Sequence, residues 1–444
     1  MIGQFPWDPF PPGEPDPKGP DPVHSLAFRA AVTAADAYHA VRVAVRRESG
    51  TLRIGNRFVP EARYREVAFL AFGNAANSMA LAALHAVGDR LTQGFLAGPE
   101  PVATEVPFQG TRVAPGWPGA PEAAGVAHAA KELAADLGDH DLLLVLLSPG
   151  ALRALAEPPP GMAPAEFDHF LQEAFAQGAT GREVALLARV LGGGAVGGRL
   201  AAAIPRADVA TLVVDRGDGP GVLGGGPMRP VSAAERTEAR TVLSRVGLEE
   251  SLPATARYAL RPDAAGSPTG RSERAVVIAT PSDALRAASD AVFDKGWSSR
   301  LAFLSLPDPT ETAVRRFLDR SEELYVAERL TPESRTRGVA TFAMTTLGLP
   351  EGVDEGPSLG LFLTRAQALL RRREMSVGLF RTGGDPGVAP GRAPTPFPPG
   401  AVVGQPTDPD AKVVPGHARA VRMRAGITDV GCLALAVYPR PGGP

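Results

Sequence analysis

The chain has 444 residues, 44% of them hydrophobic and 21% charged, which are the proportions of a soluble globular protein and predict more than one domain. A net charge of -2, from 46 basic and 48 acidic residues, excludes the strong field that draws nucleic acid or anionic lipid to a protein. The single cysteine, Cys432, excludes intrachain disulfides and a cysteine-based metal site.

The first 23 residues form a proline-rich N-terminal arm (1–23) without periodicity. Its aromatic residues Phe5, Trp7 and Phe10 are compatible with an arm docked on the body, and a loosely packed terminus is the equal alternative. The arm lacks the basic region and apolar core of a secretory signal, and the apolar runs elsewhere have the length of strands. We therefore expect a cytoplasmic protein without membrane insertion.

Residues 24–260 alternate helical and strand patterns and are expected to form one α/β domain. Apolar residues at helical spacing predict one long helix over 25–48, and alternation predicts a strand over 51–59. Further strands are predicted over 66–72, 141–148 and 210–215, with helices over 75–85, 123–137, 164–177, 182–191 and 232–246. Strands that alternate with helices predict a Rossmann-like, mainly parallel sheet covered on both faces.

The rest of the chain is expected to divide into a connecting α/β segment over 261–322 and a second, smaller α/β domain over 323–444. Apolar runs in that domain predict strands over 324–330, 358–364, 375–380 and 432–437. A long loop rich in proline and glycine covers 382–415, and loops of such length are usually functional or mobile.

Five short stretches follow one another in a fixed order beside these predicted elements. They are GNAANSMA at 73–80, LLSPGALRAL at 146–155, ARVLGGGAVGGRLA at 188–201, TLVVDRGDGPGVLGGGPM at 211–228 and RAGITDVGCL at 424–433. In order, spacing and flanking strands they resemble the class II glycerate 2-kinases, whose C-terminal half is called the MOFRL domain. The resemblance extends over most of the chain, from Ser25 to Val437.

The resemblance implies that D-glycerate is phosphorylated at its 2-hydroxyl by ATP with a divalent metal, in a cleft between a Rossmann-like domain and the smaller one. Matched residue by residue, it places a nucleotide or substrate cleft at Gly73, Asn74, Ser148, Gly150, Gly197 and Gly198. It also offers four vestigial candidates for catalysis, namely Arg189, Asp215, Asp218 and Asp385.

Charged groups of the family's motifs are replaced in this chain. Asn74 stands where the family has a lysine, and Val196 replaces the lysine before the two glycines. Pro149 replaces a glycine and offers no backbone N–H to an anion. One preorganised donor to a developing anion is worth on the order of 3 kcal/mol, so these losses together weaken phosphoryl transfer.

Metal binding stays open at one place in the sequence. Asp215 and Asp218 could hold Mg²⁺ through water, or they could only form turns in a glycine-rich loop. None of the seven histidines has the paired spacing of metal ligands, so no metal ligand is assigned.

The pattern of loss favours a pseudoenzyme, because apolar strands and glycine turns persist while lysines and carboxylates are replaced. We therefore expect a glycerate 2-kinase-like protein that has lost ATP-dependent phosphotransfer and serves as a structural, regulatory or assembly component. It would form a homo-oligomer or bind another protein chain, and no cofactor is expected. The alternatives are an active, divergent kinase for glycerate or a related hydroxy acid, which needs Mg-ATP, and a small-molecule sensor that uses the interdomain cleft.

Overall fold

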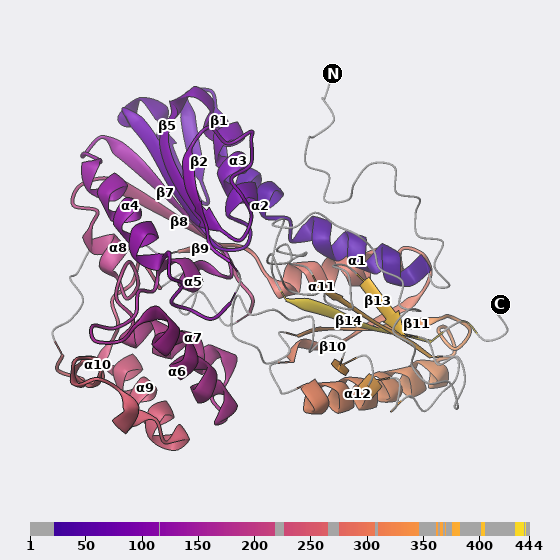
Figure 1. The fold of residues 1–444 in the computed structure, drawn as a ribbon. Helices are drawn as coiled ribbons and strands as arrows, with labels where there is room; N and C mark the ends of the chain where they lie inside the picture. Colours follow the sequence, from indigo (N-terminus) through magenta and orange to yellow (C-terminus); the bar gives the residue numbers. More distant parts are fainter. Residues whose placement is uncertain are drawn as a thin grey trace. The chain divides into compact units, whose positions relative to one another are not determined.

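The computed structural model describes residues 22–114, 116–217, 226–264, 275–306, 310–345, 361–362, 365–366, 369, 375–381, 401–404, 431–438 and 440. The chain divides into two compact units (Figure 1). We call residues 37–279 with 349–354 the N-terminal unit, and residues 1–36, 280–348 and 355–444 the C-terminal unit. The first helix, α1, therefore belongs to the C-terminal unit although it comes first in the sequence.

The N-terminal unit is built on a six-stranded sheet with the order β6-β5-β4-β7-β8-β9. All of its paired strands run parallel. The strands are β4 (Glu66–Phe72), β5 (Leu91–Gly98), β6 (Gln109–Arg112), β7 (Asp141–Leu147), β8 (Asp208–Val214) and β9 (Val276–Ala279). Every residue of β7 is buried, as expected for a central parallel strand with both faces covered. The predicted α/β fold class with a mainly parallel sheet is confirmed.

Helices cover this sheet and form an additional cluster beside it (Figure 1). Those packed near the strands are α2 (Ala37–Ala44), α3 (Ala76–Val87), α4 (Ala123–Asp136), α5 (Ala151–Leu155) and α8 (Arg199–Ala202). The additional cluster contains α6 (Pro164–Ala176), α7 (Gly181–Leu191), α9 (Ala233–Val246) and α10 (Ala254–Ala259). It has a core of its own, which includes Phe167, Phe170, Leu187 and Leu243. The described part of this unit also contains the short 3-10 helices η1 (Glu61–Arg63), η2 (Gly88–Arg90) and η3 (Glu249–Ser251).

The predicted long helix over 25–48 is wrong. The structure has two helices there, α1 (Pro22–Ala34) and α2, and then the strand β1 (Val45–Glu48). The strand forms because the backbone of β1 finds an antiparallel partner in β2 (Thr51–Ile54). The spacing of apolar residues within a short segment does not reveal whether a distant segment will pair with it as a strand.

The predicted single strand over 51–59 is a hairpin. β2 pairs antiparallel with β3 (Arg57–Pro60), and with β1 the two strands make a three-stranded sheet. The turn before β2 holds Ser49 and Gly50, both with positive φ, and the turn after it begins at Gly55 with φ +58°. Two-residue turns with positive φ match the twist of a hairpin, which explains the glycines.

The C-terminal unit has a mixed five-stranded sheet with the order β10-β11-β14-β12-β13. Its strands are β10 (Ser298–Leu306), β11 (Val339–Thr345), β12 (Ser376–Arg381), β13 (Ala401–Gly404) and β14 (Cys432–Tyr438). Helices α1 and α11 (Pro281–Phe293) lie together on one face, and α12 (Thr310–Leu330) lies on the other (Figure 1). The strands predicted over 375–380 and 432–437 are confirmed as β12 and β14.

The predicted strand over 324–330 is wrong, because these residues end the helix α12. The apolar residues of this run are spread around the helix: Tyr325 stacks on Tyr438 with ring centroids 4.2 Å apart, whereas Val326 and Leu330 are exposed. Of the predicted strand over 358–364, the described residues Leu361 and Phe362 are helical. Apart from β13, the long loop over 382–415 lies outside the described residues, as do residues 1–21 of the arm. Among the helices that the structure describes, none is long and apolar enough to cross a bilayer.

Candidate functional site

The strand order of the N-terminal unit marks one place for a ligand. The chain runs outward from β4 through β5 to β6, then returns to the other side of β4 and runs outward again through β7, β8 and β9. β4 and β7 pair in parallel from Glu66 and Asp141 to Phe72 and Leu147. Open α/β sheets bind ligands outside the carboxyl ends of the strands, where the strand order reverses. The loops that follow β4 and β7 are therefore the candidate site.

These two loops are hydrogen-bonded to each other. The backbone N–H of Asn74 donates to the carbonyl oxygen of Pro149 at 2.7 Å. The N–H of Ala75 donates to the Ser148 hydroxyl at 3.0 Å, and that hydroxyl donates to the carbonyl of Phe72 at 3.1 Å. Ser148 is fully buried, so these bonds are shielded from water. The first N–H groups leading into α3, which face a phosphate in nucleotide-binding turns, here hold the neighbouring loop.

The glycines of both loops are required by packing. Gly73 has φ +106°, and a Cβ added to it would lie 2.2 Å from the carbonyl oxygen of Ser148. Gly150 has φ +93°, and its added Cβ would lie 2.7 Å from the Asn74 side-chain oxygen. Only glycine combines such a backbone conformation with such close approach. Four of the six cleft residues predicted from the sequence thus meet at the β4 and β7 loops.

We expect Ser148→Ala to lower the free energy of unfolding by about 2 kcal/mol, because the buried N–H of Ala75 would lose its acceptor. Urea denaturation followed by circular dichroism measures this loss. Ser244→Ala is the control, since Ser244 is exposed and its hydroxyl bonds only the Glu249 side chain on the surface. The control should change stability by no more than about 0.5 kcal/mol. Equal effects of the two substitutions would contradict the role of Ser148.

Arg153, one helical turn beyond Gly150, fastens the loop before α4. Its guanidinium donates to the carbonyl oxygens of Ala114 at 3.1 Å and of Trp117 at 2.5 Å. Burial lowers the pKa of Arg153, while the charges of Asp168 and Glu122 act in the opposite direction. Arg153 therefore faces two acidic residues of its own unit and serves to position this loop.

Arg189 lies in α7 and is only 2% exposed. Its guanidinium donates to both carboxylate oxygens of Glu235, at 2.6 Å and 3.2 Å, and to the carbonyl of Pro230 at 3.3 Å. Arg229 donates to the same carboxylate at 3.2 Å. The structure thus places the first catalytic candidate in an ion-pair network that joins α7 to the start of α9.

Glu235 is the centre of this network. Burial by itself raises the pKa of Glu235, but hydrogen bonds from Arg229 and Ser232 and the charge of Arg189 outweigh it and lower the pKa to about 2. The carboxylate is therefore ionised at neutral pH, and it balances the buried charge of Arg189.

The turn at Gly197 and Gly198 packs against the segment that carries Arg229. Gly198 has φ +83°, and an added Cβ would lie 2.6 Å from the backbone nitrogen of Pro230. Arg199 donates to the carbonyl oxygens of Gly192 and Val196 at 2.9 Å and 3.1 Å. This turn is therefore packed against the Pro230 backbone on one side and held by the Arg199 side chain on the other.

Of the remaining candidates, Asp215 lies in the described part of the chain. Asp215 follows β8 directly, is 6% exposed, and its N–H donates to the carbonyl of Ala279 at 2.9 Å. Asp218 and Asp385 lie outside the described residues. Within the described part of the chain, no three His, Cys, Asp or Glu residues are grouped closely enough to hold a metal ion. Cys432, within β14, is buried.

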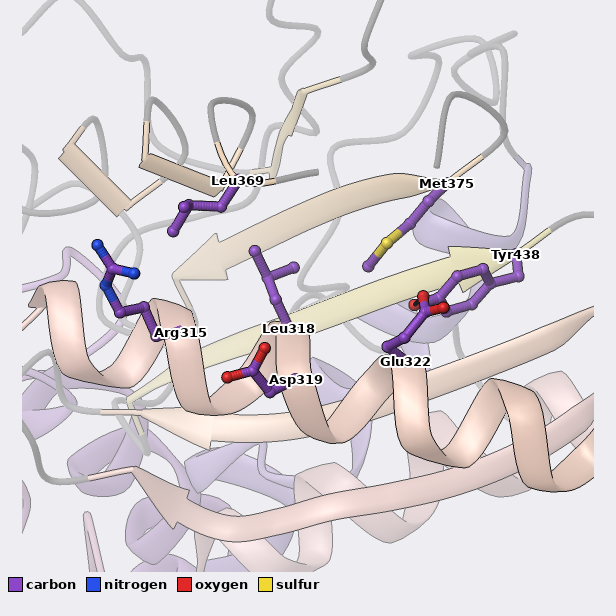
Figure 2. Close-up of a pocket in the computed structure, with 7 residues that line it drawn as sticks. All are labelled: Arg315, Leu318, Asp319, Glu322, Leu369, Met375 and Tyr438. Atoms are coloured by element: carbon purple, nitrogen blue, oxygen red, sulfur yellow. Dashed lines mark hydrogen bonds between the residues drawn. The ribbon is translucent and has the colours of Figure 1, made fainter. Parts of the chain in front are cut away.

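A small pocket lies in the C-terminal unit beside α12 (Figure 2). Its cavity volume is about 60 Å³, enough for a few water molecules. The lining residues are Arg315, Leu318, Asp319, Glu322, Leu369, Met375 and Tyr438. Tyr438 donates to the Glu322 carboxylate at 3.4 Å. Charged side chains of α12 and the apolar side chains of Leu318, Leu369 and Met375 line the pocket together (Figure 2). None of these residues was predicted as a site residue.

Most of the N-terminal unit matches a known protein family. A family model described as "Domain of unknown function (DUF4147)" matches residues 24–261, which is more than half of the chain. The chain belongs to the DUF4147 family. The match covers β4, β7 and β8, and with them the Gly73 and Ser148 loops of the candidate site.

Two curated proteins resemble this DUF4147 chain in sequence. One, from Agrobacterium vitis, is named "Putative hydroxypyruvate reductase" and is 36% identical over 159 residues, 35% of this chain and 40% of that protein. The other is a glycerate kinase from Danio rerio, 28% identical over 260 residues, 55% of this chain and 51% of that protein. The matches thus span about half the length of these relatives or less, and the sequence is similar to those parts of a glycerate kinase and of a protein named as a putative hydroxypyruvate reductase.

Two solved structures share the fold of the DUF4147 chain. A glycerate kinase from Thermotoga maritima has a TM-score of 0.66 and 19% identity, covering 94% of this chain and 100% of that one. The PH0495 protein from Pyrococcus horikoshii OT3 has a TM-score of 0.65 and 18% identity, covering 94% and 98%. Both units of the DUF4147 chain therefore have counterparts within single known structures.

Sequence reasoning missed the residue that holds Arg189. Ser232 and Glu235 form a capping box, so the sequence S-x-x-E signals the start of α9. That signal explains Glu235 by local structure alone. Nothing in the spacing shows that the same carboxylate also binds an arginine 46 positions earlier.

Proposed function

We propose that this chain is a glycerate 2-kinase-like protein that no longer transfers phosphate from ATP and that serves as a non-catalytic structural, regulatory or assembly component. The relationship to glycerate kinases in this proposal is supported by the family match and by the names of the relatives. The observation that carries the loss of activity is the pairing of the β4 and β7 loops. There the N–H groups of Asn74 and Ala75 donate to Pro149 and Ser148.

Phosphoryl transfer depends on cations and preorganised donors around the moving charge. At the β4 turn the side chain is the neutral Asn74, and it lies against Gly150. The arginine offered as a remnant of the site, Arg189, is paired with Glu235. A phosphate at the turn before α3 would have to break two hydrogen bonds between the loops without a lysine to compensate for them.

The wider organisation belongs to the same proposal. Residues 323–444 would be a MOFRL-like domain, and the protein would act in the cytoplasm as a homo-oligomer or with another protein chain. The domain plan predicted from the sequence has boundaries at residues 24–260, 261–322 and 323–444, whereas the two compact units divide after Asp36 and after Ala279. No cofactor is required for such a role.

Ligand binding and turnover by the purified full-length chain test the proposal. We expect no rise in Tm with Mg-ATP, Mg-ADP or D-glycerate, and no ADP release above buffer in a coupled assay that detects a known glycerate kinase. A rise of several degrees with Mg-ATP, or measurable ADP release, would overturn it. Stabilisation by D-glycerate without turnover would favour the sensor instead.

If ADP release is found, Asn74→Ala identifies its source. Loss of turnover in that variant would assign an active, divergent kinase to the β4 and β7 loops. Unchanged turnover in Asn74→Ala would place the activity elsewhere in the chain or in a contaminating enzyme.

A further inference from the structure

The carboxylate of Glu235 is surrounded as a bound anion would be. It accepts hydrogen bonds from Arg189 at 2.6 Å and 3.2 Å and from Arg229 at 3.2 Å. It also accepts from the backbone N–H and the hydroxyl of Ser232, both at 2.8 Å. Bidentate hydrogen bonds between an arginine guanidinium and a carboxylate are stronger and more specific in geometry than hydrogen bonds between neutral groups.

These donors come from two separate parts of the chain. Arg189 belongs to α7, Arg229 to the segment before α9, and Ser232 is the N-cap of α9, a helix of 14 residues. The capping box accounts for the contacts with Ser232 but not for two arginines that converge on the same carboxylate. Since Arg189 is 2% exposed, its charge is costly to bury unless an anion accompanies it.

We propose that Arg189, Arg229 and Ser232 form a carboxylate-binding cradle that Glu235 occupies as a built-in ligand. Its ligand class is the small monocarboxylate, since a carboxylate already fills it with each oxygen hydrogen-bonded. The cradle is closed in this chain because the ligand is tethered to α9. This inference concerns binding between α7 and α9 and does not depend on the absence of phosphotransfer.

Removal of the tether opens the cradle to an anion from solution. Glu235→Ala deletes the carboxylate and leaves space for formate or acetate between the two guanidinium groups. Such an anion would bind the folded state and not the unfolded chain, so it would raise the stability of the variant by mass action. Wild-type protein would gain nothing, because its own side chain fills the cradle.

The test compares the Tm of the full-length wild type, Glu235→Ala and Glu249→Ala in sodium chloride, sodium formate and sodium acetate at equal ionic strength. Glu249 is the matched control: it also binds an arginine and a serine, Arg240 at 2.8 Å and Ser244 at 2.7 Å, but on the surface. We expect formate and acetate to raise the Tm of Glu235→Ala by several degrees over chloride, and to leave the other two proteins unchanged. Equal responses of all three proteins would overturn the proposal.

Refolding covers the case in which Glu235→Ala does not fold in chloride. The urea-unfolded variant is diluted into chloride, formate or acetate, and the recovered soluble, cooperatively melting protein is measured. Recovery only in the carboxylate buffers supports the cradle. Failure in all three buffers overturns it, because the missing ligand would then not be replaceable from solution.

Discussion

Replacing Glu235 by Gln will lower the free energy of unfolding by about 3 kcal/mol at neutral pH, because it leaves the buried charge of Arg189 without its counter-ion. The shift of the Glu235 pKa from 4.5 to about 2 corresponds to a similar figure of about 3 kcal/mol. Since the folded-state pKa is lowered, this stability is fully present above pH 4.5 and declines as the pH falls toward 2. Urea denaturation at a series of pH values measures it.

The difference between wild type and Glu235→Gln should therefore shrink steadily below pH 4.5. Glu249→Gln serves as the control, since its partner Arg240 is 59% exposed and surface ion pairs are worth only about 0–1 kcal/mol. A loss in Glu235→Gln no larger than in Glu249→Gln would show that the network with Arg189 does not stabilise the fold.

Replacing Gly73 by Ala will cost about 3–5 kcal/mol, the combined effect of a strained backbone and an overpacked contact. Gly73 has φ +106°, and the new Cβ would lie 2.2 Å from the carbonyl of Ser148, which is backbone and cannot rotate away. Because Gly73 lies between β4 and α3, the effect would reach the centre of the sheet. Urea denaturation, or the yield of folded protein where the loss is too large, is the measurement.

Gly125→Ala is the matched substitution. Gly125 lies in α4, where an added Cβ meets nothing within 4 Å. Alanine is a better helix former than glycine by up to about 1 kcal/mol, so this variant should be slightly more stable than wild type. If Gly73→Ala were as stable as Gly125→Ala, that result would contradict the close packing between the loops that follow β4 and β7.

The central strands could be predicted from the sequence because strands that are buried on both faces consist almost entirely of apolar residues. β4, β7 and β8 are nearly continuous apolar runs, as parallel strands covered on both faces must be. The wrong secondary-structure predictions concern segments whose structure depends on contacts with another part of the chain. Val45–Glu48 becomes a strand through pairing with β2, and 324–330 stays helical through packing against the sheet that carries Tyr438.

The sequence was sufficient to predict which loops form the candidate site, but not the contacts between them. Glycines and a serine after apolar strands placed Gly73, Ser148 and Gly150 at the carboxyl ends of β4 and β7. The hydrogen bonds that join those loops depend on the register between β4 and β7, 75 positions apart in sequence, which a single sequence does not contain. For the same reason, the sequence could suggest Arg189 as a remnant of catalysis but could not show that Glu235 binds it.

The placement of α1 affects the order in which the protein can be assembled. α1 is synthesised well before its packing partners α11, β13 and β14, which all come from residues after 280. His24 in α1, for example, bonds Ser376 in β12 at 3.0 Å. Until those partners have been synthesised, the apolar side chains of α1 lack these contacts, which favours chaperone binding during translation. A fragment cut at the limits of the family match, 24–261, would keep α1 and lose all of these partners, so a well-behaved N-terminal fragment should begin after Asp36.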